Sequence, residues 1–348
     1  MKRRLTIRDV AKKASLSVST VSLVLNNKPN VSEQTRRRVQ QVIAELGYHP
    51  RRSARGLASK ASGNIGFILT EDHFSQAEPF YTKIFLGTEF EARNHNFYVL
   101  LTTVGRTLRE SKEVPRFFLE QNVDGVIVAG KISTSWIEYI RDWNLPVILI
   151  DYDLPHHNVS SVVIDNRRGA SAVVEHLLKR GHTKIGFIGG DIQHPSIAER
   201  YTAYREALAS HGIEVTDSWI SIDQPDTRLS DGYQAARKIF FNNNDRPTAV
   251  FAANDAMAIG CMQYLKETGM RIPNDEALVG FDNIEASIHV EPRLTTVNVP
   301  KEEMGSLAVR RLVEMIKEKN AVVTKTLVPV ELVVRESCGV KQSGLALD

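Results

Sequence analysis

The chain has 348 residues, with 44 Lys or Arg, 41 Asp or Glu and a formal net charge of +3 at pH 7. It contains no long uncharged apolar run, no leader that is both cationic and apolar, and only two cysteines, Cys261 and Cys338. Membrane spanning, export and a disulfide framework are therefore not expected, and a reducing, cytoplasmic setting is favoured.

The charge is concentrated at the N-terminus. The first sixty positions hold fourteen Lys or Arg and three acidic residues, a net charge of about +11, which leaves about −8 for the rest. Neutralising phosphates supplies most non-specific DNA affinity, so a small cationic unit on an acidic body is expected when only that unit binds nucleic acid. A solvated basic tail is the alternative, but such a tail would lack apolar periodicity.

Three helices are predicted in this basic segment. Apolar residues recur at helical spacing over 7–14, after Thr6 as a candidate N-cap. A second helix is expected from residue 18, after Ser17 as its cap, and a third from Ser32 to a left-handed stop at Gly47. Two short helices joined by a tight turn and braced by a third form a helix-turn-helix unit.

In that unit the second helix enters the major groove of DNA. Its hydroxyl groups can bond phosphates or base edges, whereas Val18 and Leu23 offer only apolar contact, for example to a thymine methyl. The residues predicted to contact DNA in this unit are Thr6, Ser17, Val18, Ser19, Thr20, Ser22, Leu23 and Asn26.

The first sixty residues resemble the DNA-binding headpiece and hinge of the LacI/GalR (lactose-repressor) family. The resemblance is carried by T-I-R-D-V-A-K-K-A-S-L-S-V-S-T-V-S-L-V-L-N, V-S-E-Q-T-R-R-R-V, E-L-G-Y-H-P and S-A-R-G-L-A, in the family's order and spacing. It implies a headpiece at 1–48 and a hinge at 49–61. Leu23 departs from the long polar side chain of many members, so bidentate contact with guanine is lost there. Pro50-Arg51 replaces the usual proline-asparagine and adds a phosphate-binding charge.

The hinge is by composition a basic linker in which Gly56 weakens any helix. The resemblance implies that it becomes helical on operator DNA, pairs with its twin in a homodimer and inserts Leu57 into the minor groove. Such a wedge costs a few kcal/mol of unstacking, which bending and wider contact recover. A simple tether is the alternative interpretation. The hinge residues predicted to contact DNA are Arg51, Ser53, Arg55 and Leu57.

Roughly 280 further residues alternate short β-branched segments with helical stretches, which favours parallel sheets covered by helices. Because N-I-G-F-I-L at Asn64 and K-I-G-F-I-G at Lys184 each open a run of β-α units, two doubly wound lobes are expected. The expected strands are 65–69, 98–102, 126–129, 147–150, 185–188, 249–252 and 278–281.

This part, residues 62–340, resembles the periplasmic-binding-protein-like regulatory body of the same family, in which the chain crosses between the lobes three times. The resemblance implies a first lobe at about 62–163 and 297–327, and a second at about 164–296 and 328–340. A ligand is expected at the carboxyl ends of the strands, between the lobes. The fold class predicted for the whole chain is α/β, with an all-α helix-turn-helix headpiece.

The loops after the strands carry aromatic rings, carboxylates, an amide and a guanidinium, a set that suits a polyhydroxylated ligand. Three alternatives stay open: Asp165 as part of the crossover, Arg200 with Asp282 as a structural ion pair, and either fold for the loop of His194. Asp255 is interpreted as a helix cap. By position, the residues matching the family's effector pocket are Phe80, Tyr81, Asp165, His194, Ser196, Arg200, Asn254 and Asp282.

The sequence shows no phosphate-binding glycine loop, no H-E-x-x-H and no G-x-S-x-G, so no enzyme, metal site or cofactor is predicted. A transcriptional regulator, with a repressor favoured, explains the headpiece and the body together. It would bind a near-palindromic operator as a homodimer, with a tetramer left open, and answer to a sugar-like effector. A regulator answering to a phosphoprotein co-repressor is the main alternative. A sugar-binding protein without a DNA role explains only the body.

Overall fold

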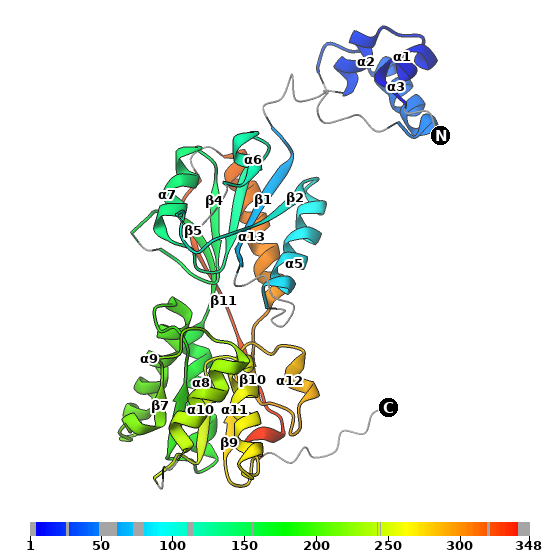
Figure 1. Ribbon diagram of the computed structural model, residues 1–348. Coiled ribbons are helices and arrows are strands. Elements are labelled where there is room, and N and C mark those ends of the chain that lie inside the picture. The colour runs from blue at the N-terminus through cyan, green and yellow to red at the C-terminus, as the bar shows by residue number, and fades with distance from the viewer. Residues whose placement is uncertain are drawn as a thin grey trace, which may run out of the picture.

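The computed structural model describes residues 5–25, 28–48, 61–71, 80–109, 114–154, 156–241, 243, 245–318 and 321–339. The predicted fold class is confirmed, because three N-terminal helices precede a body built on two parallel sheets (Figure 1). Five residues predicted to contact DNA lie outside the described residues: Asn26, Arg51, Ser53, Arg55 and Leu57.

The headpiece consists of α1 (Ile7–Ala14), α2 (Val18–Leu25) and α3 (Glu33–Leu46). These bounds follow from the caps that the sequence supplies. The backbone N–H of Thr6 donates to the Asp9 carboxylate at 2.8 Å in a capping box, which satisfies a donor at the start of α1.

The other two helices are delimited in the same way. The backbone N–H of Thr20 donates to Ser17 Oγ at 3.0 Å at the start of α2, and Gly47 ends α3 with a φ of 61°. Val10, Val21 and Val39, one from each helix, are fully buried together. The apolar spacing therefore folds this basic segment around a small core of its own.

The first lobe is a six-stranded parallel sheet in the order β11-β5-β4-β3-β1-β2. Helices cover both of its faces, because alternate strand residues pack on α5 and α13 on one side and on α6 and α7 on the other. The elements are β1 (Asn64–Thr70), α5 (Phe80–Asn94), β2 (Tyr98–Val104), α6 (Arg116–Leu119), β3 (Gly125–Ala129), α7 (Thr134–Asp142), β4 (Val147–Ile150), β5 (Ser160–Ile164), α13 (Lys301–Lys317) and β11 (Lys325–Val328).

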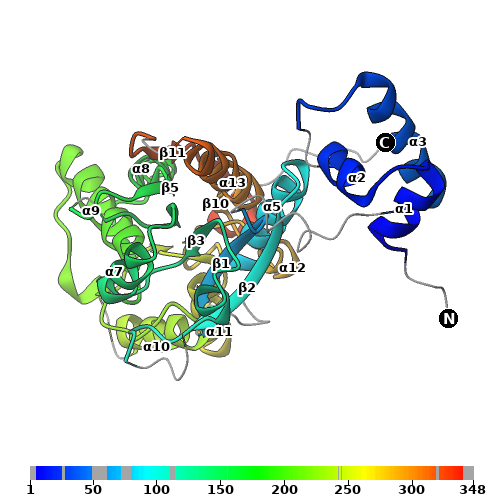
Figure 2. The same cartoon turned by 90° about the horizontal axis from the view of Figure 1, so that it is seen from above.

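Helix α13 lies directly beside α5, although more than 200 residues separate them in the sequence (Figure 2). Glycines make this close approach possible. A Cβ on Gly87 of α5 would lie 1.9 Å from the backbone oxygen of Glu302, and one on Gly305 of α13 would lie 2.2 Å from the oxygen of Ile84. The N-terminal end of α13 is thereby fixed on the first lobe.

The second lobe is a four-stranded parallel sheet in the order β7-β6-β8-β9, again flanked by helices. Its elements are α8 (Asn166–Lys179), β6 (Ile185–Ile188), α9 (Pro195–Ser210), β7 (Ile220–Ser221), α10 (Leu229–Phe240), β8 (Ala249–Ala252), α11 (Asp255–Glu267), β9 (Ala277–Val279) and α12 (Ala286–His289).

The chain passes between the lobes after β5, before α13 and after β11. The second crossing lies near Val299 and Pro300, not before residue 297, because β10 (Thr296–Asn298) pairs with β12 (Glu331–Val333) and Thr295 bridges to β9. All three connections are short. Among the described residues, none of the helices has the length and apolar composition needed to cross a membrane.

Candidate functional site

Helix α2 presents an exposed face on the headpiece. Val18 and Leu23 are 42% and 40% exposed and Ser19 is exposed, whereas Val21 and Val24 are buried toward the other helices. Because burial separates the two faces, the side chains predicted to contact bases are those that solvent, or DNA, can reach.

Three of the hydroxyl groups predicted to contact DNA lie at helix starts. Those of Ser17 and Thr20 bond each other at 2.8 Å at the N-terminus of α2, and Thr6 Oγ1 donates to Asp9 at 2.7 Å beside α1. Ser22 is half-buried in α2. Backbone N–H groups and the helix dipole favour phosphate at helix starts, and contact of Thr6, Ser17 and Thr20 with the DNA backbone stays a prediction.

A cavity of about 290 Å³ lies between the two lobes of the body. The segments that follow β2, β3 and β4 line it from the first lobe together with the start of α5, and those that follow β6, β7, β8 and β9 line it from the second lobe. This is the position expected for a ligand in doubly wound sheets. Seven residues matched to the effector pocket line it: Phe80, Tyr81, His194, Ser196, Arg200, Asn254 and Asp282.

Asp165, the eighth, is not among the lining residues. Its carboxylate caps α8, accepting the backbone N–H of Arg168 at 2.9 Å, so the side chain is committed to the helix start at the first crossing. Of its two interpretations, the structure favours the crossover role.

Arg200 is 3% exposed and held by the protein on several sides. Its Nε donates to Asn166 Oδ1 at 2.8 Å, its Nη1 donates to the oxygen of Ala253 at 2.6 Å, and the guanidinium lies 3.8 Å from the centre of the Phe281 ring. Nη1 also lies 3.5 Å from Oδ1 of Asp282. The pair is therefore part of the structure as well as of the cavity wall.

Asp282 retains unused acceptor capacity. Its Oδ1 is buried and accepts no hydrogen bond from the described residues. Burial raises the pKa of Asp282 to about 6; Arg200 and Lys301 oppose that rise, and Asp151 adds to it. At neutral pH the carboxylate is mostly ionised and can accept bonds from ligand hydroxyl groups.

Asp151 belongs to the same wall, although it was not predicted from the sequence. Tyr81 donates its hydroxyl to Asp151 Oδ2 at 2.8 Å, and Ser196 Oγ of the second lobe donates to the Asp151 backbone oxygen at 2.7 Å. His194 Nε2 lies 3.9 Å from Asp151 Oδ2, and burial lowers the pKa of His194. The available signal was an aspartate directly after a predicted strand, 147–150.

Asn254, not Asp255, caps α11, which corrects the interpretation of Asp255. Asn254 Oδ1 accepts the backbone N–H of Met257 at 2.8 Å. The fully buried Asp255 accepts the backbone N–H of Ile284 at 2.8 Å and the hydroxyl of Thr296 at 2.5 Å. Burial, followed by the nearby Asp282, raises the pKa of Asp255 to about 8. Asp255 thus supports the segment that carries Asp282.

Two cations that were not predicted from the sequence join the lobes at the cavity. Lys131 Nζ donates to the oxygen of Gln193 at 2.7 Å, and Arg106 Nη2 lies 3.6 Å from Asp226 Oδ2. No cluster of three or more His, Cys, Asp or Glu that could hold a metal ion occurs in the part of the chain that the structure describes. The arrangement suits binding of a polar organic molecule.

Known protein families match both the headpiece and the body of the chain. Residues 6–51 match the model of bacterial regulatory proteins of the lacI family, and residues 174–338 match a periplasmic binding protein-like domain. Catabolite control protein A of Priestia megaterium is 32% identical over 90% of this chain and 93% of its own length.

Two solved structures resemble the whole chain. The complex of the transcriptional regulator CelR with cellobiose is 31% identical, with a TM-score of 0.73 over 96% of this chain and all of that one. The Lac repressor dimer bound to operator and the anti-inducer ONPF is 29% identical, with a TM-score of 0.80 over 97% and 99% of the two chains. The chain therefore belongs to the LacI family and is a DNA-binding transcriptional regulator, not an enzyme.

Proposed function

We propose that this regulator is a repressor whose affinity for its operator is set by a sugar-like molecule bound between the lobes. The observation that carries the proposal is the buried Asp282 carboxylate, whose Oδ1 lies 3.5 Å from the fixed guanidinium of Arg200 and accepts no hydrogen bond from the described residues. An acceptor and a donor side by side match neighbouring hydroxyl groups, each of which donates and accepts.

The aromatic residues of the cavity support the same ligand class. The rings of Phe80 and Tyr81 meet edge to face at 5.1 Å and line the first-lobe wall. An aromatic ring can pack against the apolar face of a sugar while the carboxylates bind its hydroxyl groups. The similar regulator CelR has been solved with cellobiose. A phosphoprotein co-repressor would need an exposed surface and leaves the cavity's polar groups without a role.

A thermal-shift screen tests this proposal. Sugars, sugar phosphates, nucleosides and purines would be added separately to the purified full-length chain. A ligand that binds only the folded state at 100 times its Kd stabilises by about 2.7 kcal/mol, so a sugar or sugar derivative should raise the melting temperature by several degrees. Stabilisation by purines or nucleosides alone, or by no compound of the panel, would contradict the proposed ligand class.

We further propose that the chain acts in the cytoplasm as a homodimer. Large apolar side chains are exposed at the β2 edge of the first lobe and on neighbouring α5: Tyr98 is 68% exposed, Phe90 53% and Leu101 38%. A second copy packed over this edge would remove apolar area from water and protect the open strand.

A homodimer predicts the symmetry of the operator. Two headpieces related by a twofold axis require inverted half-sites. Selection from random duplex DNA with the full-length chain should therefore return an inverted repeat. Recovery of a direct repeat, or of no enriched sequence, would show that the proposed symmetry is wrong.

A further inference from the structure

A buried lysine stands behind the cavity wall. Lys301 is the first residue of α13 and is 8% exposed. Both circumstances are unfavourable, because a helix N-terminus disfavours cations and lysine is rarely buried without partners. A lysine kept at such a position indicates that its partners there require it.

Those partners connect the two lobes. Lys301 Nζ donates to the backbone oxygen of Asp282 and also contacts those of Val299 at 3.2 Å and Asn283 at 3.5 Å. The same ammonium lies 5.6 Å from the centre of the Phe80 ring, within reach of a cation–π interaction. Phe80 of the first lobe and Asp282 of the second both line the cavity, so one cation contacts both walls.

The turn that Lys301 holds is strained. Asp282 and Asn283 have φ angles of 103° and 52°, in the left-handed region that side chains other than glycine rarely adopt. Such a conformation persists only when surrounding contacts impose it. Carbonyl groups of both residues accept from Lys301, which fixes the turn on α13.

We propose that Lys301 is a positioning residue of the effector cavity, which holds the Asp282–Asn283 turn against the first lobe and so aims the Asp282 carboxylate at the ligand. This inference rests on the proposed function only in calling the cavity an effector site. The charge of Lys301 has a second effect, since the ammonium favours the ionised form of the Asp282 carboxyl group. Without that charge, more of the carboxyl group would be protonated at neutral pH and would present a donor where the ligand needs an acceptor.

The effect of Lys301 on the pKa of Asp282 has to be separated from that of the other charged groups around this carboxylate. Arg200 and Lys301 lower the pKa of Asp282, Asp151 raises it, and Asp255 lies close enough for its own pKa to be raised by Asp282. Because the folded-state pKa of Asp282 is raised to about 6, its contribution to stability is complete below the unfolded value of about 4 and is lost as pH rises through about 6.

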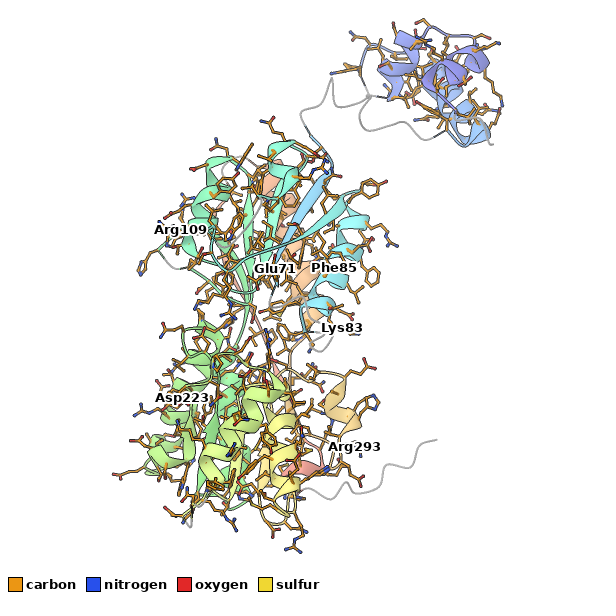
Figure 3. All side chains as sticks on the ribbon, viewed as in Figure 1. Glu71, Lys83, Phe85, Arg109, Asp223 and Arg293 are labelled. Carbon is orange, nitrogen blue, oxygen red and sulfur yellow. The ribbon has the colours of Figure 1, made fainter. Side chains whose placement is uncertain are left out.

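The test compares K301M and K83M, each with and without D282N, in unfolding experiments from pH 4 to 8. Lys83 is the matched control: it lies on α5 near the second lobe (Figure 3), is 44% exposed in its side chain and pairs with Glu302 at 3.5 Å. The difference in unfolding free energy between each protein and its D282N partner, plotted against pH, isolates the titration of Asp282. We expect the midpoint of this titration to rise by about one pH unit in K301M and to stay unchanged in K83M.

Two further variants separate charge from packing if K301M folds poorly. K301R keeps the cation and should keep the wild-type midpoint, whereas K301Q keeps a donor but loses the charge and should shift the midpoint as K301M does. A K301M or K301Q midpoint equal to that of K83M, or an equal shift in K301R, would overturn the proposal. Because no ligand is used, these outcomes are independent of whether the screen finds a sugar.

Discussion

Replacing Arg200 with alanine is expected to weaken binding of the stabilising ligand by roughly 30- to 1000-fold, a loss on the order of 2–4 kcal/mol. The guanidinium is fixed by Asn166, Ala253 and Phe281, so it meets a ligand already oriented. Its removal leaves ligand oxygens without a donor in a buried site. Calorimetry with the strongest compound from the screen measures the loss.

Arg205→Ala is the matched control, because Arg205 lies on the same helix but is exposed, and its guanidinium lies 5.8 Å from the centre of the Tyr201 ring. Ligand affinity should be unchanged in that variant. The Arg200 variant should lose some stability, since it removes the donors to Asn166 Oδ1 and to the Ala253 oxygen, yet DNA binding without ligand should remain near normal. Unchanged ligand affinity in a folded Arg200→Ala protein would mean that the ligand binds elsewhere.

Val18→Glu should weaken binding to the selected operator by at least about 100-fold, because it places a negative charge on the helix face that meets DNA. The headpiece itself should stay folded. Val18 is 42% exposed and is the first residue of α2, where an acidic side chain interacts favourably with the helix dipole. A fluorescence anisotropy titration measures the affinity, and circular dichroism checks the fold.

Gln40→Glu adds the same charge to an exposed position on α3 and serves as the control. We expect it to change operator affinity by less than about tenfold, through long-range repulsion alone. Equal losses in the two variants would show that α2 does not form the DNA-facing surface.

The parts of the fold that depend on local pattern were predictable from sequence. Strands β4, β6 and β8 have the bounds that their short apolar runs predict, and Thr6, Ser17 and Gly47 delimit the headpiece helices as expected. In each case the signal lies within a few residues of the element, where apolar spacing and caps act directly.

Several strands that were not predicted from the sequence depend on distant segments, whereas the two-residue β7 (Ile220–Ser221) pairs with the nearby β6. Strand β5 opens with two serines and is completed by β11, which arrives more than 150 residues later. Strands β10 and β12 have three residues each and exist because the crossings bring them together. No local pattern specifies such pairings, which explains why β5, β10, β11 and β12 were not predicted.

The candidate site shows the same division. Residues that follow predicted strands in the sequence could be proposed from the resemblance, and seven of them line the cavity. Lys301 could not be proposed from the sequence, because a lysine at the start of a helix normally lies in solvent. It is buried because α13 packs back on the first lobe in the folded chain. Asp165 was assigned by position, but its carboxylate is occupied by capping α8.

The most direct test of effector control is an operator titration with and without the ligand. The full-length chain would be titrated onto its selected inverted repeat, at constant salt because phosphate contacts make affinity salt-dependent. A saturating concentration of the compound that most stabilises the protein should change the operator Kd by at least about tenfold, in either direction, a coupling of about 1.4 kcal/mol. The Arg200→Ala protein should show no change at the same concentration. An operator Kd that is the same with and without the bound compound would contradict control of DNA binding from the cavity.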